Sequence, residues 1–201
     1  KLISDFEGIV VNNGSPDKTI DVLFDEKKKN TFKIINLKRN YGYTSSYLAG
    51  MYHSQKDMII TVSADLHEDP DKIKDMIKIH YSTNKPIIGI YKKRHESFLK
   101  NFFSNEYYRF MKIIKIPIIK NHADFRLITK EINTNFFNDL PSFVFIRIRI
   151  LDFIDSYEKI FYVGNDRKIG STKFNFISSS LLALDTILFY AKSFLKRIIF
   201  T

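Results

Sequence analysis

The sequence predicts a single α/β domain with a Rossmann-like, mostly parallel central sheet covered by helices. Short apolar runs alternate with longer amphipathic segments along the first half, which is the pattern of strand–helix–strand units. The length of 201 residues and the 44% content of hydrophobic residues suit one globular domain with a full core. No internal repeat and no low-complexity linker divides the chain, so residues 1–201 are assigned to one domain.

The first half contains four apolar runs that predict strands, at residues 8–12, 32–37, 58–62 and 87–91. Helices are expected between them, at residues 18–24, 44–54 and about 69–81. The last of these begins with Asp69 and Pro70, which are both favoured in the first turn of a helix. Parallel sheets bind ligands at the carboxyl ends of their strands. The polar turns at residues 12–17 and 63–69 are therefore expected at a binding edge.

The second half is less regular. It contains a long basic segment at 98–114 that predicts a helix, and short strands at 124–128 and 159–163. Residues 146–150 alternate with period two, which favours a strand, although a helix remains open. Residues 178–200 predict a helix that is apolar at first and basic at its end. Such a helix suits an anionic membrane surface, and packing on the domain core is the alternative.

The net charge of +10 favours anionic partners, namely nucleic acid, acidic lipid headgroups or phosphorylated substrates. Aromatic residues lie mostly in apolar runs instead of among the basic loops, which argues against nucleic-acid binding. The absence of cysteine excludes disulfides and cysteine-ligated zinc. No apolar run reaches the roughly 18 residues of a membrane span.

Two turns that follow apolar strands are candidates for a donor site. Asp65 follows the strand at 58–62, with Glu68 close by, and carboxylates at a strand end suit Mg²⁺ or Mn²⁺ carrying a diphosphate. The alternative is a helix N-terminus that acidic side chains stabilise. Residues 13–17 could hold a ribose or base, and a plain strand-to-helix turn is the alternative there.

Two further segments suit phosphate recognition. Asp124 and Arg126 lie two residues apart, hence on one face of a strand, where one could orient an acceptor and the other pair with its phosphate. A structural ion pair is the alternative. Residues 166–173 combine three cations, a glycine and two hydroxyl side chains, which suits phosphate binding. A solvated basic loop is the alternative for that segment.

Six segments in this order resemble glycosyltransferase family 2, and look closest to its polyprenyl-phosphate branch, such as dolichyl-phosphate mannosyltransferase and bactoprenol glucosyltransferases. They are residues 11–19, 37–51, 63–70, 92–100, 123–127 and 167–174. The resemblance implies a GT-A-like fold. It implies an inverting enzyme that moves a sugar from a nucleoside-diphosphate sugar to a polyprenyl phosphate, or to another cell-envelope glycan acceptor. It also implies an amphipathic helix at residues 143–153, which we adopt over the strand.

The resemblance further implies roles for single residues, with Asp124 matching the acid suggested as catalytic base. Donor contacts are implied for Asn13, Arg39, Asn40, Gly42 and Asp65, and a metal site for Asp65 and Glu68. Contacts to donor or acceptor phosphates are implied for Arg94, Arg126, Arg167, Thr172 and Lys173. Residues 175–201 are expected to form an amphipathic helix at the cytoplasmic face of the membrane, and a homo-oligomer stays open.

The chain departs from the family pattern in three ways. Ser63 replaces the first acid of the Asp-x-Asp motif, and Asn13 replaces an acid in the nucleoside turn. The family's first strand is missing, and would precede Lys1, so we expect an N-terminally truncated domain. Loss of a carboxylate weakens a metal site because fewer charged oxygens remain. The alternative function is therefore a catalytically degenerate relative that acts as a binding or partner protein.

The acceptor decides the expected role of Asp124. A phosphate monoester has its second pKa near about 6, so its oxygen is mostly deprotonated at neutral pH and needs no strong base. Asp124 would then position Arg126 or the acceptor. With a sugar hydroxyl as acceptor, Asp124 would instead remove a proton.

Overall fold

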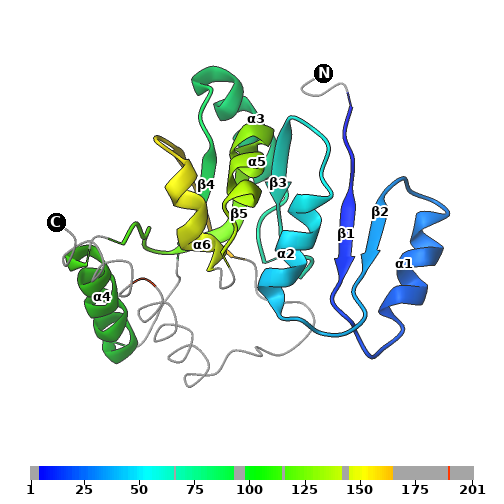
Figure 1. Ribbon diagram of the computed structural model, residues 1–201, viewed down its shortest axis with the longest axis horizontal. Helices are drawn as coiled ribbons and strands as arrows, with labels where there is room; N and C mark the ends of the chain where they lie inside the picture. The colour runs from blue at the N-terminus through cyan, green and yellow to red at the C-terminus, as the bar shows by residue number, and fades with distance from the viewer. Residues whose placement is uncertain are drawn as a thin grey trace.

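The computed structural model describes residues 5–65, 67–92, 98–114, 116–141, 145–164 and 190. In its first half, strands and helices alternate as β1 (Ile9–Asn12), α1 (Thr19–Lys27), β2 (Lys33–Asn36), α2 (Tyr43–Tyr52), β3 (Met58–Thr61), α3 (Lys72–Thr83) and β4 (Ile87–Tyr91). The second half contributes α4 (Phe98–Ile113), β5 (His122–Thr129), α5 (Lys130–Asn138), α6 (Ile146–Arg149), the 3₁₀ helix η1 (Ile150–Phe153) and β6 (Glu158–Tyr162), as Figure 1 shows.

These strands form two sheets. β1 and β2 pair in parallel, and a larger sheet has the order β3-β5-β4-β6. The α/β class and the mostly parallel sheet are confirmed, because β3, β4 and β6 run in one direction and β1 is parallel to β2; β5 alone is reversed, antiparallel to both β3 and β4. Ile90 at the end of β4 lies opposite His122 at the start of β5, so the chain leaves and re-enters the sheet at the same edge. Strand direction is not readable from an apolar run, which is why the sequence did not predict it.

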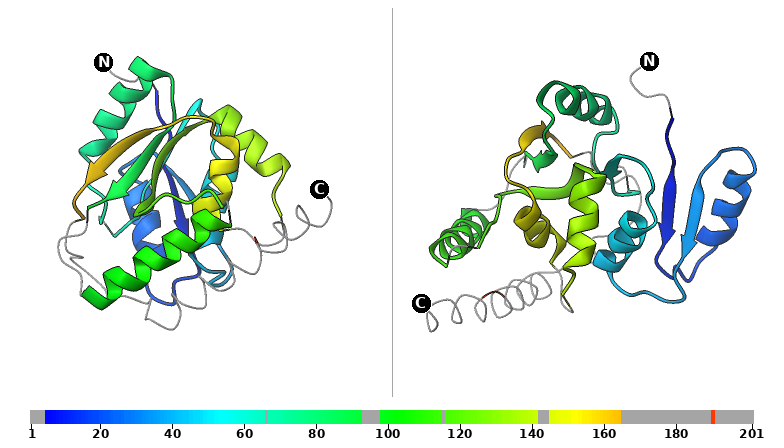
Figure 2. Two further views of the ribbon diagram at one scale, coloured as in Figure 1. Left: turned by 90° about the vertical axis from the view of Figure 1, so that its left-hand side faces the viewer. Right: turned by 45° about the horizontal axis from the view of Figure 1, so that its top comes forward.

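Helices cover both faces of the larger sheet (Figure 2). On one face, Met76 and Ile77 of α3 pack against a cluster that includes Phe125 and Leu127 of β5. On the other face, Met51 of α2, Phe136 of α5, and Ile146 and Ile150 from α6 and η1 surround Ile128. Side chains alternate across a strand, so His122, Asp124, Arg126 and Ile128 share this second face. β5 therefore presents a polar row toward α6.

β1 and β3 leave one edge each without a main-chain partner among the described strands. Helix α2 packs against both of them, and a Cβ on its Gly50 would lie 3.4 Å from a Val11 methyl. The apolar run of β1 is only half-buried, whereas residues 87–90 of β4, which is paired on both edges, are fully buried. The two bare edges would accommodate a further strand; the missing strand itself stays a prediction.

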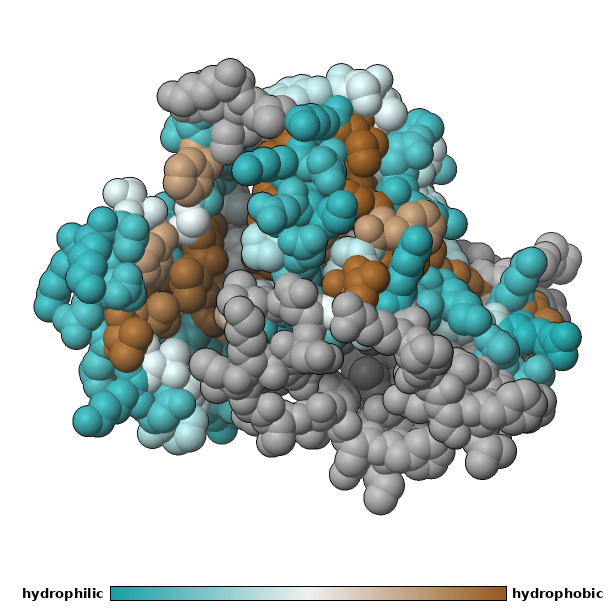
Figure 3. Space-filling view, turned by 180° about the vertical axis from the view of Figure 1, so that it is seen from behind, coloured by the Kyte–Doolittle hydropathy of each residue, from teal (hydrophilic) through white to brown (hydrophobic). Residues whose placement is uncertain are grey.

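The smaller sheet carries a loosely packed helix. α1 has no buried residue, and its Val22 and Phe24 are 57% and 53% exposed. Seen from behind, the molecule mixes hydrophilic side chains with apolar ones that reach the surface (Figure 3). Side chains connect the two sheets just before β1 and β3 begin. Lys56 pairs with Asp5, and Glu7 accepts the Gln55 main-chain N–H at 2.5 Å.

Two local expectations have clear outcomes. The helix adopted for residues 143–153 is confirmed over 146–153 by α6 and η1, and residues 143–144 lie outside the described ranges. The strand reading of 146–150 is wrong, because the alternating isoleucines are buried along a short helix. α5 was not expected at all. The helix at 178–200 lies outside the described residues apart from Tyr190, which packs near Met111 of α4. No helix within the described ranges is long and apolar enough to span a bilayer.

Candidate active site

Most of the described candidate residues lie at one end of the strands, which we call the site edge. β1 and β3 end there, at Asn12 and Thr61. Because β5 is antiparallel, its first half lies at this edge too, with Arg126 opposite Thr61. Three groups meet around the first turns of α2: a donor turn (Asn13, Arg39, Asn40, Gly42), a Ser63 cluster (Ser63, Glu68, Tyr47) and an Asp124 cluster (Asp124, Arg126, Arg147).

The donor turn is built by hydrogen bonds across a long sequence separation. The Asn13 side-chain amide donates to Asn40 Oδ1 and to the Gly42 carbonyl, both at 3.0 Å, and its oxygen accepts the Tyr41 N–H at 3.0 Å. Gly14 has a φ of 63°, and a Cβ there would lie 2.3 Å from the Arg39 carbonyl carbon. Only glycine lets these two loops approach so closely. The structure thus brings Asn13, Arg39, Asn40 and Gly42 together.

The Ser63 cluster uses its acid internally. Glu68 is 4% exposed, and its two oxygens accept the Ser63 main-chain N–H and hydroxyl, each at 3.0 Å. The Ser63 hydroxyl also lies 3.1 Å from the Tyr47 hydroxyl. By contrast, Asp65 is exposed, and its Oδ1 accepts the His67 N–H at 3.1 Å. Asp65 therefore presents a carboxylate to the edge, whereas Glu68 braces the end of β3.

The carboxylates of Asp65 and Glu68 fit a divalent ion only in part. Mg²⁺ is usually held by one or two carboxylates, with substrate phosphates and water completing its shell. In the described part of the chain, no group of three or more His, Asp or Glu side chains comes together as a ready-made metal centre. The exposed Asp65 carboxylate suits an ion that arrives with a diphosphate, while the oxygens of Glu68 are already engaged.

The Asp124 cluster lies in the protein interior. Asp124 and Arg126 are 4% and 1% exposed. Arg126 Nη2 bonds Asp124 Oδ1, and Arg147 of α6 approaches Oδ2 through Nε at 2.8 Å and Nη2 at 2.7 Å. Arg147 keeps 41% of its side chain accessible. Two guanidiniums share one carboxylate, so the cluster carries one net positive charge, which faces outward through Arg147.

Electrostatics keep this cluster cationic. Burial lowers the pKa of Arg126, with Asp124 opposing the effect, yet a guanidinium remains protonated in proteins. At Arg147, burial is the largest single effect and lowers the pKa, but the charge and hydrogen bond of Asp124, together with Tyr43 and Tyr47, raise it above its ordinary value. Burial, reinforced by the Asp124 charge, also raises the pKa of the Tyr43 and Tyr47 phenols. The tyrosines beside the cluster are therefore neutral hydroxyls.

Sequence reasoning missed Arg147 and the two tyrosines. Arg147 stands in the Ile-Arg-Ile-Arg-Ile run, where only the fold shows that it faces Asp124 while Arg149 pairs with Asp139 and Asp152. Tyr43 and Tyr47 are four residues apart on α2, a helical spacing that could have placed them on one face. Four predicted phosphate-binding residues, Arg94, Arg167, Thr172 and Lys173, lie outside the described residues.

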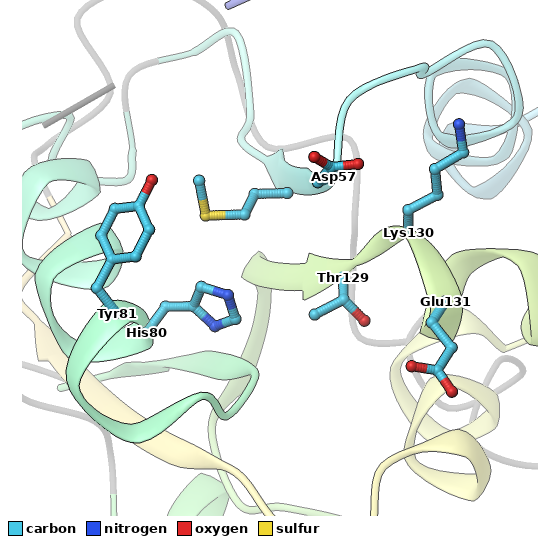
Figure 4. A pocket seen from close by; sticks show the side chains of 7 residues that line it. Asp57, His80, Tyr81, Thr129, Lys130 and Glu131 are labelled. Atoms are coloured by element: carbon cyan, nitrogen blue, oxygen red, sulfur yellow. The ribbon is translucent and has the colours of Figure 1, made fainter. Parts of the chain in front are cut away.

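A shallow pocket lies at the other end of the sheet and is separate from this edge (Figure 4). It is lined from the start of β3, the end of α3 and the start of α5, by Asp57, Met58, His80, Tyr81, Thr129, Lys130 and Glu131. Its charges are mixed, and His80 Nδ1 is already bonded to the Lys85 carbonyl at 2.8 Å. Nothing in this pocket gathers the predicted residues.

The sequence is similar to those of known proteins. Over 196 residues the chain is 30% identical to the uncharacterized glycosyltransferase sll0501 of Synechocystis sp., covering 90% of this chain and 58% of that protein. It is 28% identical to the uncharacterized glycosyltransferase YkcC of Bacillus subtilis, covering 95% and 60%. A shorter match, 38% over 80 residues, covers 39% of this chain and 25% of an undecaprenyl-phosphate 4-deoxy-4-formamido-L-arabinose transferase of Photorhabdus laumondii. The chain thus spans about 60% of the length of the relatives that it matches throughout.

A solved structure has a similar fold. The crystal structure of residues 1–349 of S. aureus TarS superposes with a TM-score of 0.53 at 13% identity, covering 77% of this chain and 48% of that one. The GT-A-like fold expected from the sequence is confirmed. The family described as Glycosyl transferase family 2 matches residues 2–171, most of the chain. The chain therefore belongs to glycosyl transferase family 2.

Proposed function

We propose that this protein transfers a sugar from a nucleoside-diphosphate sugar to a polyprenyl phosphate, with inversion at the anomeric carbon, at the cytoplasmic face of the membrane. The observation that carries the proposal is the Asp124 cluster, a buried carboxylate shared by two guanidiniums. It stands at the same sheet edge as the exposed Asp65 and the donor turn. One edge thus offers places for two phosphorylated substrates.

The acceptor phosphate is assigned to the Arg147 side of the Asp124 cluster. Guanidinium groups bind phosphate through two parallel N–H donors, and a partly buried site strengthens the attraction. Arg126 is too buried to meet a ligand directly, but Arg147 is accessible. The neutral hydroxyls of Tyr43 and Tyr47 add donors nearby. Arg94, Arg167, Thr172 and Lys173 remain proposed as further phosphate contacts.

Asp124 is proposed as a positioning residue in this reaction. Both of its oxygens accept guanidinium donors and the side chain is 4% exposed, so it is poorly placed to take a proton from an acceptor. A phosphate acceptor, mostly deprotonated above a pKa of about 6, does not require one. Asp124 instead fixes the orientation of Arg126 and Arg147, which would hold the attacking oxygen.

The donor is assigned to the donor turn and Asp65. The hydrogen bonds of Asn13 with Asn40 and Gly42 would fix the shape of the turn that receives the nucleoside. Asp65 would hold a Mg²⁺ or Mn²⁺ that comes with the diphosphate, and such an ion neutralises charge on the departing nucleoside diphosphate. Glu68 would support this arrangement by fixing Ser63 at the end of β3.

The lipid acceptor has support outside the site as well. One family relative is named as an undecaprenyl-phosphate sugar transferase. The excess of cations, +10 in total, favours an anionic membrane surface and a phosphorylated lipid. We therefore also propose residues 175–201 as a helix that contacts the membrane surface.

The test compares two arginines of the same short helix. Arg147→Gln removes the accessible guanidinium, and Asp124 keeps Arg126 as its partner. Arg149→Gln is the matched control, because Arg149 pairs with Asp139 and Asp152. With labelled nucleoside-diphosphate hexoses and a short-chain polyprenyl phosphate, Arg147→Gln should slow transfer about 100-fold, since charge-assisted bonds contribute about 1.5–3 kcal/mol. Equal activity in the two variants would remove Arg147 from the acceptor site.

A degenerate, non-catalytic relative is the second candidate, and the Ser63 cluster favours it. Ser63 follows β3 by two residues, and the buried acid Glu68 is engaged with that serine. Calorimetry with nucleoside diphosphates and Mn²⁺ separates the two candidates. Binding followed by transfer supports the enzyme, whereas binding without transfer, using any hexose donor, supports the binding protein.

A further inference from the structure

His122 belongs to the polar row of β5 but has no assigned role. It lies two residues before Asp124 and is 6% exposed, so Asp124, Arg126 and His122 form a buried row on one face of the strand. Neither of its ring nitrogens has a hydrogen-bond partner, and the Nε of Arg126 also lacks one. These three nitrogens are hydrogen-bonding positions left unfilled in the same region of the interior.

An unfilled position of this kind needs an explanation. A buried polar atom without a partner destabilises the folded protein, and native structures contain few of them. The Arg147 main chain lies near the His122 ring, but no bond of acceptable geometry forms with it. Burial, together with the charges of Arg126 and Arg147, lowers the pKa of His122 well below its ordinary value. The imidazole is therefore neutral and offers one donor and one acceptor.

We propose that His122 is a further residue of the phosphate site, whose ring donates a hydrogen bond to a bound phosphate, directly or through one ordered water. This inference rests on the proposed acceptor site at Arg147. His122, Asp124 and Arg126 would then act together at the bound phosphate. Asp124 balances one of the two guanidiniums, and the phosphate bound at Arg147 balances the other, while one ordered water beneath it can accept from Arg126 Nε, which is itself too buried to touch the ligand.

The proposal makes stability and affinity move in opposite directions. His122→Phe removes two unsatisfied nitrogens, so the free protein should have an unchanged or higher Tm. The same change removes a donor to the phosphate, so the dissociation constant for geranyl phosphate, a short prenyl monophosphate, should rise about tenfold. A histidine that only supports the fold would show the reverse, with a lower Tm and an unchanged dissociation constant.

His80 provides the matched control. Its exposed fraction of 8% is similar to the 6% of His122. Unlike His122, it lies at the far end of the sheet, and its Nδ1 is bonded to the Lys85 carbonyl (Figure 4). His80→Phe should therefore lower the Tm and leave the affinity for geranyl phosphate unchanged. Calorimetry supplies the dissociation constants, and circular dichroism supplies the Tm values.

The unsubstituted protein gives a second test that does not depend on a variant folding. With ¹⁵N-labelled histidine, the ring nitrogens of His122 should shift on addition of geranyl phosphate, and uridine diphosphate should leave them in place. If geranyl phosphate binds by calorimetry and the His122 signals stay fixed, the inference fails while the proposed function stands. If uridine diphosphate moves them instead, this is a donor-phosphate site and the inference is overturned. If geranyl phosphate does not bind at all, the acceptor site fails with it.

Discussion

Replacing Asp124 by Asn tests how much the carboxylate charge stabilises the folded protein. The change keeps the shape of the side chain but removes the only carboxylate that Arg126 and Arg147 contact in the described residues. Arg126, at 1% exposure, would keep only the Ile146 carbonyl at 3.4 Å and an amide oxygen. Stranding a buried charge in this way costs about 3–5 kcal/mol. For a chain of this length, each kcal/mol lowers the Tm by about 2–4 °C, so the Tm should fall by about 6–20 °C.

Differential scanning calorimetry checks this value against two comparisons. Asp139→Asn removes a carboxylate that is 77% exposed and pairs with Arg149, and such surface pairs contribute at most about 1 kcal/mol. The double variant Asp124→Asn with Arg126→Met should recover part of the loss, because it removes the stranded guanidinium. A Tm decrease in Asp124→Asn no larger than in Asp139→Asn would refute the electrostatic reasoning.

Three further substitutions have expected outcomes. Gly14→Ala should lower the free energy of unfolding by about 3 kcal/mol or more, because the new Cβ would lie 2.3 Å from main chain. Gly42→Ala, at a φ of 85° but facing open space, should lower it by about 1 kcal/mol. Equal Tm values for the two variants would contradict this reasoning. Ser63→Ala should lower the unfolding free energy by about 1–3 kcal/mol because Glu68 loses a hydroxyl donor, and urea unfolding with an unchanged midpoint would argue against it. Lys33 lowers the pKa of Glu7 from 4.5, so Glu7→Gln should remove a few tenths of a kcal/mol at pH 7. The folded pKa is the lower one, so this contribution is complete above the unfolded value and disappears as the pH falls through the folded value; a difference that persists at pH 2 would rule it out.

The positions of the strands in the first half were predictable, but their pairing was not. Apolar runs such as residues 87–91 mark buried strands because both faces of an α/β sheet are covered. They carry no information on direction, which for β5 depends on where α4 returns the chain. α5 was missed because its asparagines, among them Asn133 and Asn135, are weak helix formers. The one clear signal was Thr129, whose hydroxyl caps the helix by accepting the Ile132 N–H at 3.3 Å.

The candidate site was predictable where its residues form local motifs. Asn13 lies in a polar turn after a strand, the resemblance to the family added Asn40 and Gly42, and the structure brings the three into contact. Arg147 was not predictable, because its orientation toward Asp124 depends on how α6 packs on β5. The use of Glu68 was also hidden, since sequence spacing does not show that its carboxylate turns back to Ser63. Interactions between elements, and not within them, account for these differences.

The proposed donor site lies across the bare edges of β1 and β3, which belong to separate sheets. Asn13 is carried by the β1–β2 pair and Asp65 by the end of β3, and no ladder hydrogen bond connects these two bodies in the described strands. A relative shift of the two bodies on α2 would break no strand pairing. Under the proposed donor assignment, a nucleoside that contacts only Asn13 would not link them here, whereas a nucleoside-diphosphate sugar that also reaches Asp65 would. Donor binding would then stiffen this half of the molecule.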